Sequence, residues 1–342
     1  MSKPLRLFLL FCGLALFAWF IHRTGWKDIQ ITFETLGWFS LIALLPYAIV
    51  FSTDTLGWRF TFSPTALSNV SYFVTWRVRL IGEAINSVVP SFYVGGEAAK
   101  VILLKREGVS KLIATSAAIR SKTAQSVAQS TFIAMGAAVA VVTLPTDQAA
   151  AKWIFALVAL AGFSVMAFLF KIQKHGMVAT IIKWIRKLGF DLESAANRKE
   201  KIRELDGEIY NFYYRDRKRF RWCTLIYLGG WIFDTFEIMI FAHFIGVEVS
   251  WHHAFVMEAF IGVARGFNIL VPGALGIQEF SVVGLFALFI PEQPGLGAKY
   301  AIARRGREVI FAGIGWVLFT VGEISWKEIQ EGASTEPSKP ES

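Results

Sequence analysis

Cysteine and charged residues are scarce in this sequence. Only two of its 342 residues are cysteines, Cys12 and Cys223, and both lie in apolar segments, so a disulfide framework or a thiolate metal site has no basis. Charged residues make up 18% of the chain, against about 25% in an average soluble protein. Hydrophobic residues make up 54%. These proportions exclude intrinsic disorder for most of the chain, a nucleic-acid-binding arm and a single soluble domain.

Catalytic signatures are missing as well. The sequence has no nucleophile elbow, no Walker loop and no zinc-protease helix. The pair Gly95-Gly96 follows no predicted strand and has no phosphate-loop lysine after it. We therefore expect that the chain is not an enzyme and needs no cofactor and no metal ion.

Long apolar runs are what the sequence has instead. A run of about 20 apolar residues is long enough to cross a bilayer as a helix. The runs that fit are 5–21, 37–51 with an extension toward residue 60, 113–144, 151–170, 222–245 and 300–324. They predict an all-α, polytopic membrane bundle. We expect a single membrane domain over residues 1–326 and a disordered polar tail over 327–342.

Most of the net charge of +9 lies in the segment 171–221. Loops rich in Lys and Arg face the cytoplasm, so this segment and both termini are expected on the cytoplasmic side of the cell membrane. The segment also has apolar residues at helical spacing over 178–188 and 202–212, which predicts two helices, the first of them amphipathic and interfacial. The basic residues set the topology, and they can also bind anionic lipid headgroups.

Two further segments, 70–106 and 253–290, do not fit simple spans. Each has two apolar arms of about 15 residues around a centre rich in Pro and Gly, and such an arm reaches only about 22 Å as a helix. The hydrocarbon core is about 30 Å thick. Each segment is therefore predicted to form a re-entrant hairpin of two broken helices.

The centres of the two hairpins share the pattern Asn-x-x-Val-Pro-x6-Glu. The motif residues are Asn86, Pro90, Gly95, Gly96 and Glu97 in the first hairpin, and Asn268, Pro272, Gly273, Gly276 and Glu279 in the second. Proline ends a helix, and glycine allows a turn and a close approach to a ligand. The predicted topology gives the hairpins opposite entry sides, as in the inverted repeats of transporters.

Ionisable residues also occur within the apolar segments. Arg79 and Glu83 share a helical face with Asn86, and Glu258 and Arg265 lie close to the face of Asn268. Further charges of this kind are Asp234, Glu237, Arg304 and Glu308. Two interpretations stay open: a site for a lipid headgroup, or an internal network of ion pairs. Arg304, with Arg305 and Arg307 beside it, and Arg120 with Lys122 lie near predicted membrane boundaries, where snorkelling toward water is expected to account for some of these charges.

The stretch 86–100 and the run Val-Pro-Gly-Ala-Leu-Gly-Ile-Gln-Glu at 271–279 resemble the flippase-like transmembrane region of lysylphosphatidylglycerol synthases. The chain is also similar to stand-alone members of that family, including hopanoid-associated ones. The resemblance implies movement of an amphipathic lipid between leaflets, with Glu97 and Glu279 as the principal candidates. Only 327–342 follow the last run, so aminoacyl transfer by this chain is not expected.

The leading hypothesis is a lipid translocase for a phosphate-bearing or aminoacylated lipid. In it, Arg79 and Arg265 bind an anionic headgroup, while Glu97 and Glu279 act as gates, pair with those arginines or contact a cationic headgroup. The partners are then membrane lipids, not nucleic acid, and the oligomeric state stays open. The alternatives are an enzyme or enzyme partner in lipid or glycolipid synthesis, and an accessory subunit that recruits a synthase through 171–221.

Overall fold

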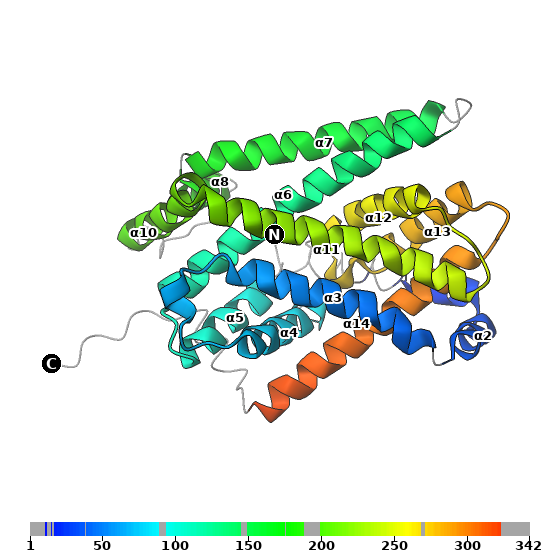
Figure 1. Ribbon diagram of the computed structural model, residues 1–342, viewed down its shortest axis with the longest axis horizontal. Coiled ribbons are helices and arrows are strands. Elements are labelled where there is room, and N and C mark those ends of the chain that lie inside the picture. Colours follow the sequence, from blue (N-terminus) through cyan, green and yellow to red (C-terminus); the bar gives the residue numbers. More distant parts are fainter. Residues whose placement is uncertain are drawn as a thin grey trace.

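Helices make up the regular secondary structure of the residues that the structure describes. The computed structural model describes residues 11, 15, 17–37, 39–88, 94–144, 149–174, 176–187, 199–267 and 271–322, and it has no strand within them. The prediction of an all-α membrane bundle is confirmed. Figure 1 shows long helices that run roughly side by side, with shorter ones between them.

The element order follows the predicted runs closely. The helices are α2 (Trp26–Leu36), α3 (Phe39–Arg59), η1 (Pro64–Leu67), α4 (Tyr72–Val88), α5 (Val94–Arg106), α6 (Lys111–Thr143), α7 (Ala149–Lys174), α8 (Met177–Lys187), α10 (Lys199–Tyr210), η3 (Asn211–Arg215), α11 (Arg217–Phe244), α12 (Trp251–Gly266), η5 (Pro272–Ala274), α13 (Ile277–Phe289) and α14 (Leu296–Val321). Much of the first predicted span, 5–21, lies outside the described residues, although 17–24 are helical. The predicted tail, 327–342, lies wholly outside them.

Among the described residues, three helices are long and apolar enough to cross a membrane by length and composition: α6, α7 and α11. Helix α3 has 21 residues and contains Pro46, and α14 has 26 residues and carries charged side chains in its middle. Those charges come from the run predicted at 300–324. The charged side chains of α14 belong to the site described below.

Helix α7 exposes most of its apolar surface. Trp153, Leu157 and Leu160 are each more than half exposed. A soluble protein does not leave a whole apolar helix in water, whereas lipid tails cover it without cost. Helix α7 packs on α6 and therefore forms a lipid-facing edge of the bundle.

Both predicted hairpins are present as pairs of short helices. The arms α4 and α5 have 17 and 13 residues, and the arms α12 and α13 have 16 and 13 residues. At 1.5 Å per residue they reach about 20–26 Å, less than the thickness of the hydrocarbon core. The arms of each pair pack on one another. Each hairpin therefore turns back inside the membrane.

The hairpins enter from opposite ends of the bundle. Helix α4 starts beside the end of α3, where Arg59 donates to the carbonyls of Val70 and Ser71, both at 2.9 Å. Helix α11 starts at this same end, because Arg219 donates to the carbonyl of Phe62. Helix α12 starts after α11 ends, at the other end of the bundle. In Figure 1 the helices of both hairpins reach toward the middle of the bundle, and η5 at the start of the second arm of the second hairpin packs on α4. The predicted inverted arrangement is confirmed.

The predicted helices of the basic segment are present as α8 and α10. Asp206 of α10 caps the start of α8, since its carboxylate accepts the N–H groups of Val178 at 2.7 Å and Ala179 at 3.1 Å. The rings of Phe168 of α7 and Trp184 of α8 stack with centroids 5.3 Å apart. These contacts hold α8 across the end of α7, as expected for a helix at the membrane surface.

Arg120 does not snorkel, contrary to the expectation from its place in the sequence. Its side chain is buried, donates to Ser116 Oγ at 2.7 Å and lies 3.7 Å from the carboxylate of Glu208. The Tyr213 hydroxyl donates to the carbonyl of Arg120 at 3.0 Å. Burial raises the pKa of Tyr213, so this hydroxyl keeps its proton and the hydrogen bond persists at high pH. Helix α10 and η3 thereby cover the guanidinium of Arg120 and keep it from extending toward water.

Candidate functional site

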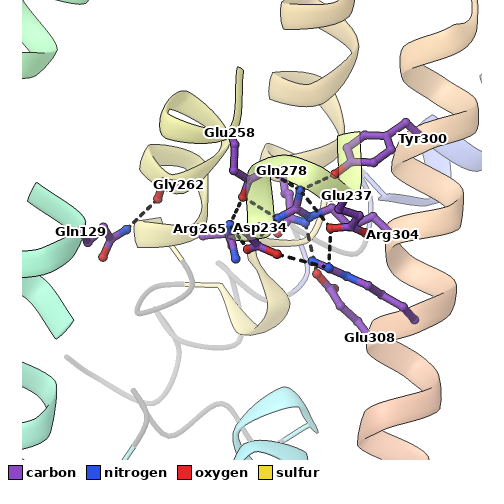
Figure 2. A network of polar contacts seen from close by, with 11 residues as sticks. Gln129, Asp234, Glu237, Glu258, Gly262, Arg265, Gln278, Tyr300, Arg304 and Glu308 are labelled. Atoms are coloured by element: carbon purple, nitrogen blue, oxygen red, sulfur yellow. Dashed lines mark hydrogen bonds and ion pairs between the residues drawn. The ribbon is translucent and has the colours of Figure 1, made fainter. Parts of the chain in front are cut away.

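A network of carboxylates and arginines joins α11, α12 and α14. We call it the central network, and it consists of Asp234, Glu237, Glu258, Arg265, Arg304 and Arg307 (Figure 2). Arg304 binds Glu258 with two parallel contacts of 2.8 and 2.9 Å. Arg265 bridges Asp234, at 2.8 Å, and Glu258. Three acids face three arginines, so the formal charges balance.

Most of the central network is sealed from solvent. Its side chains are 0–4% exposed, with the exception of Arg265 at 24%. Arg304, expected to snorkel, is fully buried and also donates to the Tyr300 hydroxyl at 2.8 Å. The expectation was wrong because the carboxylate of Glu258 lies within reach, and a paired guanidinium at depth costs less than an unpaired one. These pairs hold three helices together.

Aromatic rings cover the two ends of the central network. The guanidinium of Arg265 lies over the ring of Trp231 at 4.5 Å, and that of Arg307 lies over the ring of Tyr47 at 4.1 Å. Such cation–π contacts favour a cation in a dry environment. Tyr47 belongs to α3, so the network also reaches a fourth helix.

A second group lies where α13 begins. We call it the α13 triad, and it consists of Glu279, Arg305 and Glu308. Arg305 pairs with both carboxylates, and Gln278 donates to Glu308 at 3.2 Å. The second oxygen of Glu279 is buried and has no hydrogen-bond partner within the described part of the chain. Two acids therefore share one arginine.

A third group lies at the first hairpin. We call it the lysine cluster, and it consists of Glu83, Glu97, Lys100 and Lys122. Lys100 Nζ lies 3.0 Å from both Glu83 and Glu97, and Lys122 Nζ lies 3.3 Å from Glu97. Two acids face two lysines, so this cluster is balanced. Beside it, Arg79 of α4 pairs with Asp54 of α3 at 2.7 Å.

The motif residues shape the hairpin tips. The Asn86 side chain accepts the N–H of Gly96 at 2.9 Å and ties the two arms of the first hairpin together. Gly273 and Gly276 have φ values of 67° and 78°, a backbone region that favours glycine. Pro272 opens η5, and Gly95 lies in the first turn of α5. Pro90 and Asn268 lie outside the described residues.

The structure corrects two of the proposed pairings. Glu97 and Glu279 were expected to pair with Arg79 or Arg265 as one option, but Glu97 pairs with Lys100 of α5 and Lys122 of α6, and Glu279 pairs with Arg305. Arg79 and Arg265 already hold carboxylates in this conformation. The interpretation as internal ion pairs therefore describes the contacts that are present. A headgroup must compete with these partners to bind.

Several partners were absent from the predicted site, namely Asp54, Lys100, Arg305 and Arg307. Asp54 lies in the extension of the second apolar run, and an acid there was a signal that could have been used. Arg305 and Arg307 stand next to Arg304 in the sequence, but sequence alone does not tell which direction each side chain takes. No group of three metal-ligating side chains occurs in the part of the chain that the structure describes.

The fold and the site define a polytopic helical membrane protein with two oppositely entering broken hairpins and ion pairs at depth. The family model of the lysylphosphatidylglycerol synthase TM region matches residues 5–314. The chain belongs to this family, which relates it to lipid synthesis or lipid flipping at a membrane. No curated protein and no solved structure matches the chain significantly.

Proposed function

We propose that this chain moves an amphipathic lipid, phosphate-bearing or aminoacylated, between the two leaflets of the cell membrane. One observation carries the proposal: the two hairpins enter from opposite ends of the bundle and touch inside it, where η5 of the second packs on α4 of the first. Broken helices that meet at mid-membrane leave backbone groups and charges at depth. In transporters this arrangement forms the substrate site.

Several charged side chains of α3, α4, α5, α6 and α14 are only partly buried. Asp54, Glu83, Glu97, Lys122 and Glu308 are 20–39% exposed, in contrast to the sealed central network. An ionised group in contact with lipid tails costs several kcal/mol, so the exposed parts of these side chains favour contact with polar groups. Water or a lipid headgroup supplies them. These residues are the first that a headgroup meets.

The composition of this partly exposed set indicates the headgroup. Including Arg265, it holds four carboxylates and two cations among the described residues. Carboxylates bind the amine of an aminoacylated or zwitterionic lipid, while Lys122 and Arg265 suit its phosphate. A headgroup that carries both charges exchanges with the existing ion pairs without a net loss of contacts. We propose that no covalent step accompanies the movement.

Reconstitution in liposomes tests the proposal. The chain is incorporated into vesicles with fluorescent phosphatidylglycerol or lysylphosphatidylglycerol, and dithionite reports the lipid that reaches the outer leaflet. We expect faster movement than in empty vesicles and a loss of most of the gain in Glu97→Gln. Glu107→Gln is the matched control, because Glu107 forms an exposed pair with Arg77 at 3.0 Å.

Equal rates with the wild-type chain and with empty vesicles would refute lipid translocation. If deletion of the gene then altered the covalent structure of the membrane lipids, a role in lipid synthesis would replace it.

A further inference from the structure

Helix α6 carries polar side chains along one face near the middle of its membrane-spanning length. Lys122, Gln125 and Gln129 follow one another at spacings of three and four residues, so they share a face of the helix. All three side chains are partly exposed. We call these three residues the α6 stripe. The proposed function uses Lys122 as a phosphate ligand but assigns no role to the two glutamines.

The two ends of the α6 stripe contact different hairpins. Lys122 Nζ lies 3.3 Å from the carboxylate of Glu97 in α5, the second arm of the first hairpin. Gln129 Nε2 donates to the carbonyl of Gly262 in α12, the first arm of the second hairpin, at 2.8 Å (Figure 2). At a rise of 1.5 Å per residue, the stripe is about 10 Å long from Lys122 to Gln129. It therefore faces both hairpins and links one to the other.

A cation stands at each end of the α6 stripe. Lys122 is one of them, and its side chain is 39% exposed. The other is Arg265 of α12, whose guanidinium lies over the ring of Trp231 at 4.5 Å. The Trp231 ring stacks on the ring of Phe132 in α6, with centroids 5.7 Å apart. Phe132 is one helical turn after Gln129, so these rings hold Arg265 beside the Gln129 end of the stripe.

Gln125 lies between the two cations. Its amide forms no hydrogen bond within the part of the chain that the structure describes. Glutamines in membrane helices bond to polar groups, because an amide without a partner in an apolar medium is costly. Lipid tails offer no partner, whereas a headgroup does. An amide donates from its nitrogen and accepts at its oxygen, so it suits a phosphate as well as an ammonium group.

We propose that the α6 stripe and Arg265 form the path of a lipid headgroup between the two hairpins. The headgroup phosphate binds to Lys122 at one end and to Arg265 at the other, and the amides of Gln125 and Gln129 contact it in between. A neutral middle suits movement, because a group that is bound too tightly does not leave. The movement along this path rests on the proposed function, whereas the binding site does not.

Cysteine labelling tests the site without any transport. In a Cys12→Ser/Cys223→Ser background, Gln125→Cys is treated with a charged methanethiosulfonate reagent, which reacts with thiols that are in contact with water. Thr131→Cys is the matched control, because Thr131 is also partly exposed on α6 but lies on the opposite face. We expect several-fold faster labelling of Gln125→Cys. Equal rates would overturn the site, and if Gln125→Cys does not fold, as judged by gel filtration, Gln129→Cys decides.

Protection from labelling identifies the ligand. We expect dihexanoyl phosphatidylglycerol to slow the labelling of Gln125→Cys several-fold, since Lys122 and Arg265 are still present in this variant. Inorganic phosphate at the same concentration should leave the labelling rate unchanged. Equal slowing by both would assign the site to free phosphate and overturn the headgroup site. Labelling that neither compound slows would overturn it as well.

The liposome assay tests the path. We expect Gln125→Leu to lose most of the gain over empty vesicles and Gln125→Asn to keep most of it, because asparagine retains the amide. Thr131→Val should move lipid at the wild-type rate. Full-rate movement in Gln125→Leu would refute the path and leave the proposed function standing. Protection by phosphatidylglycerol without any lipid movement by the wild type would refute the proposed function and leave the headgroup site standing.

Discussion

Replacing Gly96 by alanine tests how closely the arms of the first hairpin must approach. A Cβ at Gly96 would overlap the carbonyl oxygen of Gly82 and the side chain of Asn86. The Gly82 carbonyl is backbone and is unable to rotate away. The Asn86 amide is the group that accepts the Gly96 N–H at 2.9 Å. The substitution therefore pushes the arms apart and weakens the hydrogen bond that joins them.

The magnitude follows from these two effects. Overpacking in a tight interior costs about 1–3 kcal/mol, and loss of a buried hydrogen bond costs about 1 kcal/mol more. The total is about 2–4 kcal/mol. At roughly 2 °C per kcal/mol for a chain of this size, the unfolding midpoint falls by about 4–8 °C. Lipid movement should fall as well, because Glu97 is displaced together with Gly96.

The assay uses the protein's own thiol. Cys223 is fully buried and its Sγ donates to the carbonyl of Gly57 at 3.2 Å, so a thiol-reactive dye labels it only on unfolding. A Cys12→Ser background leaves it as the single reporter. Gly313→Ala is the matched control, because a Cβ there would have no heavy atom within 4 Å. Equal midpoints for Gly96→Ala and Gly313→Ala, with lipid movement retained in both, would refute the close approach.

Three further predictions concern ion pairs and a helix cap. Arg304→Met should lower the free energy of unfolding by about 3–5 kcal/mol, because Glu258 loses its bidentate partner, and the loss is followed by the dye-labelling midpoint. Adding Glu258→Gln should recover part of the loss. A double variant no more stable than Arg304→Met would contradict this. Lys100→Met should destabilise the folded protein far more than Arg77→Met, because the exposed pair of Arg77 contributes only about 0–1 kcal/mol. Similar unfolding midpoints for the two variants would show that the lysine cluster does not stabilise the fold. Asp206→Ala should cost α8 about 1 kcal/mol and speed hydrogen exchange of its first amides several-fold, whereas unchanged exchange would show that the cap is dispensable.

The backbone architecture was predictable because local signals define it. Apolar length gave the spans, and proline and glycine at the motif centres gave the breaks. The strongest case is the second tip, where the positive φ values of Gly273 and Gly276 match the turn that the sequence indicates. The opposite entry of the hairpins followed from the charges of the loops between them, since the number of crossings is then determined.

The pairing of charges was not predictable, because it depends on distances between helices. Arg304 and Arg305 are adjacent in sequence but point about 100° apart on α14, so one reaches Glu258 and the other reaches Glu279. The acid at position 54 was a usable signal, but its partner, Arg79 at 2.7 Å, lies on another helix and follows only from the packing of α3 on α4. The sequence shows which charged residues are present, but the packing of the helices determines which of them pair.

The two hairpins share a backbone pattern but not the source of their counter-charges. Glu97 pairs with Lys100 of its own helix, three residues later. The corresponding position after Glu279 is Val282, which is buried in the apolar core, so Glu279 takes its cation from Arg305 of α14. The Glu97–Lys100 pair lies within the first hairpin, although Lys122 of α6 also contacts Glu97 at 3.3 Å, whereas the pair of Glu279 joins the second hairpin to α14 and breaks if the two move apart.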